Sequence, residues 1–203
     1  ENQMGIYAGK QTHQSRYVRR ELREVTVEER DLFLDAFLIM ANTNDEEGRE
    51  AYGIHYRKLD DFVKEHLIAA GELRVDHAHD GYGLATQHIA LSNAFEVAIQ
   101  AINPKITLPF WDYTIDRSWV RKTYGDNKAG HIFSDGPLFG PDWFGRTKEG
   151  VYHVTEGRFA YQKVGVDWTA EVRSPYGYLR APWNLNPSPY VSRYHKTCGV
   201  PFE

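Results

Sequence analysis

The sequence predicts a mainly α-helical protein with long irregular segments and a few short strands. Apolar residues recur at helical spacing in three stretches between residues 26 and 102. The ends of these stretches are marked by helix-capping residues, by glycine or by Asn-Pro. From Arg117 onward Gly, Pro, Trp and Tyr prevail, and the apolar runs are short. With 41% apolar and 26% charged residues, we expect a packed core rather than disorder.

The first helix is predicted to begin after Thr26. Thr26 and Glu29 have the spacing of a capping box, in which each side chain accepts a hydrogen bond from the other's backbone. The apolar residues that follow at helical spacing are Leu32, Phe33, Phe37, Leu38 and Met40. The polar run 42–45 is expected to end this helix.

Two further helices enclose a loop at residues 75–83. The earlier helix is predicted over 60–70, with His66 on its packed side one turn after Phe62. The later one is predicted from about Gln87 to Ile102. Its expected buried stripe consists of Leu91, Phe95, Ala98, Ile99 and Ile102. Beyond it we expect an extended segment over 106–113 and a short strand over 151–154.

These elements divide the chain into three parts. Residues 1–24 are predicted to form an arm over the core, and its arginines, Arg16, Arg19, Arg20 and Arg23, read most simply as a solvated charged face. Residues 25–116 form the helical region. Residues 117–203 form an irregular segment of the same domain. Its aromatic residues, which include Trp168, Tyr176, Tyr178, Trp183 and Tyr190, are expected to pack over the core or to form an interface.

Composition excludes several classes of protein. The net charge is −4 and no basic stripe is present, which argues against nucleic-acid binding. No apolar stretch approaches the roughly 18 residues of a membrane span. The lone cysteine, Cys198, excludes an intrachain disulfide, which leaves a buried thiol or a bond to a cysteine elsewhere. Because the chain starts at Glu1, we expect a processed or partial product in which no leader can be recognised.

Histidines suggest a metal site. Of nine histidines, four lie between residues 66 and 88. His66 on one helix, His79 on the loop and His88 at the start of the next helix can converge, and neutral imidazole is a common ligand of copper and zinc. Glu96 lies two turns after His88 and is expected to accept a hydrogen bond from a ligand imidazole. Spacing alone also fits surface or hydrogen-bonded core histidines.

The order of several motifs narrows this interpretation. An arginine-rich segment precedes the Thr26 helix, the sequence Asp-Phe-Val-Lys-Glu leads into His66, and His88 follows His79 by nine residues. The sequence Leu-Pro-Phe-Trp-Asp-Tyr then stands at 108–113. This order resembles the first copper site (CuA) of the type 3 copper proteins, which are the tyrosinases, catechol oxidases and haemocyanins. The resemblance covers roughly residues 16–115 and, more loosely, 136–145.

The resemblance implies a helical-bundle core that holds two copper ions, each bound by three histidines. His66, His79 and His88 match the CuA ligands. The implied function is the CuA-bearing portion of a phenol or catechol oxidase that acts on a phenolic small molecule with dioxygen. A haemocyanin-like oxygen carrier, or a structural or assembly protein that reuses this scaffold, is the alternative. The family's habit also suggests a secreted or vesicular protein.

The sequence departs from the family in several places. The second copper site (CuB) needs a His-x-x-x-His pair, but the later histidines, His131, His153 and His195, are never four apart. We therefore expect a second chain or a missing C-terminal half to carry CuB. Ile89 stands where the family has arginine. His77 replaces a cysteine that some members crosslink, and it is expected beside the ligands rather than among them. His55 is a weaker alternative to His66.

Overall fold

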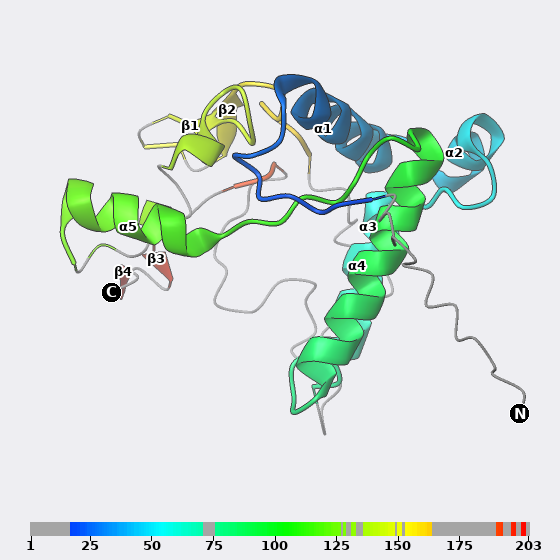
Figure 1. The fold of residues 1–203 in the computed structure, drawn as a ribbon, viewed down its shortest axis with the longest axis horizontal. Helices are drawn as coiled ribbons and strands as arrows, with labels where there is room; N and C mark the ends of the chain where they lie inside the picture. Colours follow the sequence, from blue (N-terminus) through cyan, green and yellow to red (C-terminus); the bar gives the residue numbers. More distant parts are fainter. Residues whose placement is uncertain are drawn as a thin grey trace, which may run out of the picture.

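In the computed structural model, the described residues are 17–70, 76–126, 128, 131–132, 136–148, 150–151, 153–163, 190–192, 196–197 and 200–201. Over these residues the chain is mainly helical, as the sequence predicts (Figure 1). The α-helices are α1 (Val27–Asn42), α2 (Asp45–Tyr52), α3 (Leu59–Ala70), α4 (Gly83–Ile102) and α5 (Tyr113–Tyr124). No helix in this part of the chain has the length and apolar character needed to cross a membrane.

The predicted capping box forms at the start of α1. The Thr26 hydroxyl accepts a hydrogen bond from the Glu29 N–H at 3.1 Å, and the Glu29 carboxylate accepts one from the Thr26 N–H at 2.8 Å. Two of the free amides at the helix start are thereby satisfied. The helix ends at Asn42, within the polar run expected to end it.

A helix that the sequence analysis missed, α2, follows directly. Asn44 caps it by accepting a hydrogen bond from the Glu47 N–H at 2.9 Å, and its first turn carries three acidic residues. Such acidic residues are favoured at the positive end of the helix dipole. With eight residues, of which Gly48 alone is buried, α2 has no apolar stripe to reveal it.

The two predicted helices around the loop are confirmed as α3 and α4, with one boundary corrected. The later helix begins at Gly83, four residues before Gln87, so His88 lies in its second turn rather than at its start. Gly83 follows a tight turn in which its N–H donates to the Asp80 carbonyl at 3.0 Å. A Cβ atom at Gly83 would lie 2.6 Å from the His77 carbonyl oxygen, so this close approach favours glycine.

The expectation of irregular structure from residue 117 is wrong for the first eight residues, because α5 continues to Tyr124. Asp112 caps α5 by accepting a hydrogen bond from the Thr114 N–H at 3.0 Å. Among the described residues after it are a 3-10 turn, Pro137–Phe139, and four short strands. Strand β1 (Arg146–Thr147) pairs antiparallel with β2 (Val154–Glu156), and β3 (Lys196–Thr197) pairs antiparallel with β4 (Val200–Pro201).

The strand predicted over 151–154 is therefore displaced towards the C-terminus. Val154 lies opposite Thr147 in the β1–β2 pair and is fully buried, whereas Val151 belongs to the turn between the two strands. A turn at Gly150, whose φ is +74°, takes up Val151, the first residue of the predicted strand.

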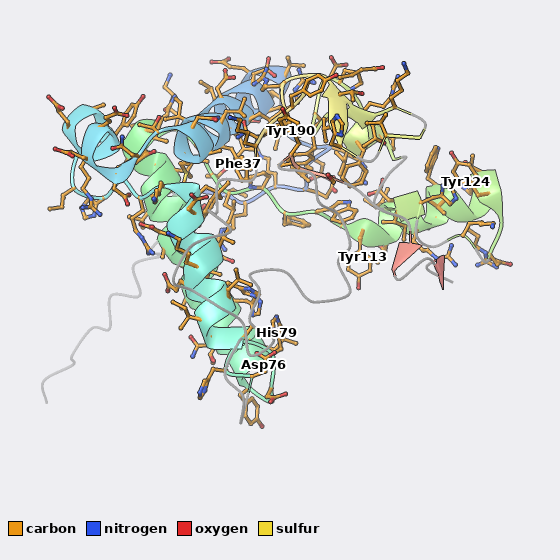
Figure 2. All side chains as sticks on the ribbon, turned by 180° about the vertical axis from the view of Figure 1, so that it is seen from behind. Phe37, Asp76, His79, Tyr113, Tyr124 and Tyr190 are labelled. Carbon is orange, nitrogen blue, oxygen red and sulfur yellow. The ribbon has the colours of Figure 1, made fainter. Side chains whose placement is uncertain are left out.

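The core lies where α1 crosses one end of the α3–α4 pair. Helix α1 packs against both α3 and α4, and these two pack side by side (Figure 1). The Phe37 ring, labelled in Figure 2, contacts Phe95 of α4 at 6.0 Å and Phe159 at 5.9 Å between ring centroids. The core members are Phe33, Leu34, Ala36, Met40, Tyr56, Phe62, Ala98, Ile99, Ile106, Val154 and Phe159. The other end of the α3–α4 pair extends away from α1 (Figure 1).

The described part of the arm, residues 17–24, is attached to the helices by ion pairs. Arg19 pairs with Glu96 of α4, Arg20 with Glu29 of α1, and Arg23 with the buried Asp116 of α5. Backbone hydrogen bonds between residues 20–22 and Phe110 hold the arm beside the 106–113 segment. These arginines thus fasten the arm in place instead of forming a purely solvated face.

Candidate metal centre

Three histidine side chains converge at the loop end of the α3–α4 pair. His66 comes from the last turns of α3, His79 from the connecting turn, and His88 from the second turn of α4. Their ring centroids are 5.0–5.4 Å apart, and one nitrogen from each ring lies within 4.8 Å of the others. Figure 2 shows His79 at this end of the pair, far from Phe37 in the core.

Helix geometry explains why His66 faces the other two. His66 lies one turn after the buried Phe62, so both side chains point to the side of α3 that faces α4. His88 lies on the same side of α4 as Leu91 and Phe95, which are partly buried against the core. The packing that buries the apolar stripes therefore also brings the two helical histidines together.

Two of the imidazoles are oriented by hydrogen bonds at Nδ1. The Asp76 carboxylate accepts one from Nδ1 of His79 at 2.7 Å, and the Leu84 carbonyl accepts one from Nδ1 of His88 at 2.8 Å. Both acceptors lack a proton to donate, so Nδ1 carries a hydrogen in each ring, and in the neutral ring Nε2 keeps its lone pair. Nε2 is therefore the atom through which His79 and His88 can each bind a metal.

The electrostatics favour neutral imidazole at His66. Partial burial lowers the pKa of His66, and the nearby rings of His79 and His88 lower it further, whereas Asp76 opposes them. For Asp76 itself burial raises the pKa, but hydrogen bonds from His79 and Ala78 outweigh this effect and hold the pKa below its ordinary value. Metal binding needs a neutral ligand imidazole, and the lowered pKa of His66 favours that state.

The spacing of two of the three imidazoles matches that of ligands on one metal ion. Two nitrogens bound to one ion at about 2.0–2.1 Å in tetrahedral geometry are ~3.3 Å apart. Nε2 of His66 and Nε2 of His79 lie 3.3 Å apart. A hollow of about 30 Å³ beside His66 and His88 has room for an ion or a water molecule. Three neutral nitrogen ligands suit copper and zinc alike and leave a position open.

The structure places the other predicted site residues away from the ligand atoms. Glu96 accepts hydrogen bonds from Arg19 at 3.1 Å and from the Leu108 N–H at 2.9 Å, and neither partner is a histidine. His77 and His55 are exposed and do not belong to the histidine cluster. Ile89 is 60% exposed on the outward side of α4.

Asp76 was not predicted from the sequence, although its carboxylate contacts the His79 imidazole. The sequence does contain an indication of this contact. Asp76 stands three residues before His79, a spacing at which an Asp side chain can fold back onto a turn. Helical periodicity favours Glu96 because it places this residue on the same face as His88, but periodicity says nothing about turns.

In the described part of the chain the cluster of His66, His79 and His88 is the one group of three potential metal ligands. His131 stacks on Tyr124 with ring centroids 4.3 Å apart, and His153 contacts the rings of Tyr161 and Tyr190. His195 and Cys198 lie outside the described residues, as do Arg16, Trp168, Tyr176, Tyr178 and Trp183.

A larger cavity of about 290 Å³ lies at the start of α1 and shares no lining residue with the hollow beside the histidines. Phe33 and Ile106, both buried, line it together with Trp143.

In comparisons with known proteins, the chain matches no protein-family model and no curated sequence.

Proposed function

We propose that this chain is the CuA-bearing portion of a tyrosinase-like phenol or catechol oxidase. The observation that carries the proposal is the convergence of His66, His79 and His88, with ligand nitrogens within 4.8 Å of one another. These are the three histidines that the resemblance to type 3 copper proteins assigns to CuA. The donor set, three neutral nitrogens with an open position, suits copper.

Each residue would have a defined role in this function. His66, His79 and His88 would bind copper through Nε2, while Asp76 and the Leu84 carbonyl keep the protons on the opposite nitrogens of the last two rings. Bound copper supplies the electron-transfer chemistry by which dioxygen oxidises a phenol. Because the His79 side chain is 42% exposed, a small phenol can approach this side of the site from solvent.

A second copper is part of the proposal. The resemblance implies two copper ions, and one group of three histidines is present among the residues that the structure describes. The second set of ligands would come from a partner chain or from additional sequence of the same protein. Reversible oxygen carriage by a haemocyanin-like protein would use the same ligands, so catalytic turnover is needed to separate the two functions.

The test is the copper content of the assembled native protein, followed by its activity on catechol. We expect two copper ions per assembled particle, and we expect catechol oxidation with uptake of dioxygen. His66→Ala should lose the copper held by this chain, whereas His55→Ala, the same change at an exposed histidine outside the cluster, should keep it. Absence of copper, or one zinc in its place, would refute both oxidase and carrier; two coppers without catechol turnover would favour the carrier.

A structural or assembly role without catalysis is the second candidate. It is favoured by the single trihistidine group in the described residues and by Ile89, which replaces the cation of the family motif. Under this alternative His66→Ala would change neither the metal content nor the assembly of the protein. The same copper measurement therefore decides between this role and the oxidase.

A further inference from the structure

We infer that Asp76 is a positioning residue that selects the tautomer of His79 and thereby sets the metal affinity of the site. The inference rests on the proposed metal function, but its central claim concerns the location of one proton. Asp76 and His79 are labelled side by side at the end of the α3–α4 pair in Figure 2.

The Asp76 carboxylate is held from several directions. Its Oδ1 atom accepts hydrogen bonds from the backbone N–H groups of Ala78 and His79, both at 2.9 Å. Its Oδ2 atom faces Nδ1 of His79 at 2.7 Å. The backbone N–H of Asp76 donates to Asp80 at 3.0 Å, which fixes the start of the same turn. Rotation of the Asp76 carboxylate away from His79 would break its bonds with the Ala78 and His79 N–H groups, so its direction is built into the turn.

This geometry determines the state of two histidines. A carboxylate only accepts, so Nδ1 of His79 carries a hydrogen, and the neutral ring then presents the Nε2 lone pair. Nε2 of His66 lies 3.3 Å from that lone pair, and a hydrogen bond between the two atoms needs a hydrogen on His66. Without metal, His66 is therefore the donor. Metal binding requires His66 to move its hydrogen from Nε2 to Nδ1, whereas His79 is already in its binding form.

The substitution Asp76→Asn separates tautomer control from turn formation. The Asn carbonyl oxygen can still accept from the two backbone N–H groups, and this places the amide NH₂ group against Nδ1 of His79. Because that NH₂ group donates, His79 would move its hydrogen to Nε2 and lose the lone pair that binds metal. Asp80→Asn is the matched control, because it removes the same charge from the same turn and the Asp80 carboxylate accepts from a backbone N–H rather than from an imidazole.

The experiment measures imidazole tautomers by ¹⁵N NMR on the metal-free full chain, together with the affinity for Zn²⁺ by competitive titration. We expect Nδ1–H at His79 and Nε2–H at His66 in the wild type, and Nε2–H at His79 in Asp76→Asn. The zinc affinity of Asp76→Asn should fall by about 10–100-fold, the usual effect of losing a partner of a ligand histidine. Asp80→Asn should keep the wild-type tautomer and an affinity within about threefold.

Two results would overturn the inference. One is an Nε2–H tautomer at His79 in the wild type, which can be observed whether or not any variant folds. The other is equal loss of affinity in Asp76→Asn and Asp80→Asn, which would assign Asp76 to the turn alone. If the wild type binds no zinc and no copper while His79 shows Nδ1–H, the proposed function fails and the tautomer assignment stands.

Discussion

Phe62 is the residue on which the placement of α3, and with it His66, most depends. Its side chain is 4% exposed, and its ring packs edge-on against Phe95 of α4 with centroids 5.3 Å apart. The Arg57 guanidinium lies 4.3 Å from the centre of the Phe62 ring. Because Phe62 precedes His66 by one turn, loss of this contact should loosen the part of α3 that carries the metal ligand.

The expected cost of Phe62→Ala follows from these contacts. Burying a phenylalanine stabilises a fold by about 1.5–3 kcal/mol, and truncation adds the cost of the cavity left behind, which brings the total to about 3–5 kcal/mol. The edge-on pair with Phe95 contributes about 0.5–1.5 kcal/mol of that total. We expect the free energy of unfolding to fall by about 3–4 kcal/mol, a large share of the roughly 5–15 kcal/mol of an ordinary domain.

Urea unfolding followed by circular dichroism measures this loss. The neighbouring substitution Val63→Ala is the control, since Val63 is 38% exposed and should cost less than about 1 kcal/mol. Phe62→Leu, which leaves a smaller cavity, should cost about 1–2 kcal/mol and remain folded if Phe62→Ala does not. Equal costs for Phe62→Ala and Val63→Ala would refute the packing of α3 against α4 described above.

Three further predictions concern the elements around α1. Tyr56→Phe removes a hydroxyl on a fully buried ring that donates to the Thr43 carbonyl at 3.0 Å. It should lower the free energy of unfolding by about 1–2 kcal/mol. A change below about 0.3 kcal/mol in urea titrations would contradict this. Gly48→Ala should destabilise the protein by about 1–3 kcal/mol, because the new Cβ would lie 1.9 Å from the Tyr56 ring. This cost should outweigh the better helix propensity of alanine. A higher melting temperature would instead show that the ring moves aside. A hydrogen bond from the Thr26 backbone N–H, with further ones involving the Thr26 hydroxyl and Arg20, lowers the pKa of Glu29 from its ordinary value of 4.5. The stability that the Glu29 carboxylate contributes is therefore present above pH 4.5 and is lost as the pH falls through the lowered pKa. Glu29→Gln should therefore flatten the pH dependence of the melting temperature below pH 4.5, and unchanged curves would exclude this role.

Helices were predictable where capping signals and an apolar stripe agreed. The capping box of Thr26 and Glu29 predicts the start of α1. The buried stripe of α4 is visible in the sequence because it faces the core over several turns. Helices α2 and α5 were missed for a different reason. Helix α2 buries Gly48 and little else, and α5 is polar over most of its surface, so their caps at Asn44 and Asp112 were the only strong local signals.

By itself the sequence determined the mainly helical class and the capping of α1, because both depend on local spacing along the chain. The order of motifs also pointed to His66, His79 and His88, but the packing of α3 against α4 is what brings the two helical histidines together. Only the tertiary structure decided which carboxylate contacts an imidazole. Glu96 satisfies Arg19 and Leu108, residues remote from it in sequence, while the turn at 76–80 folds Asp76 back onto His79. Hydrogen-bond partners depend on where whole elements cross and how a turn closes, and neither periodicity nor composition carries that information.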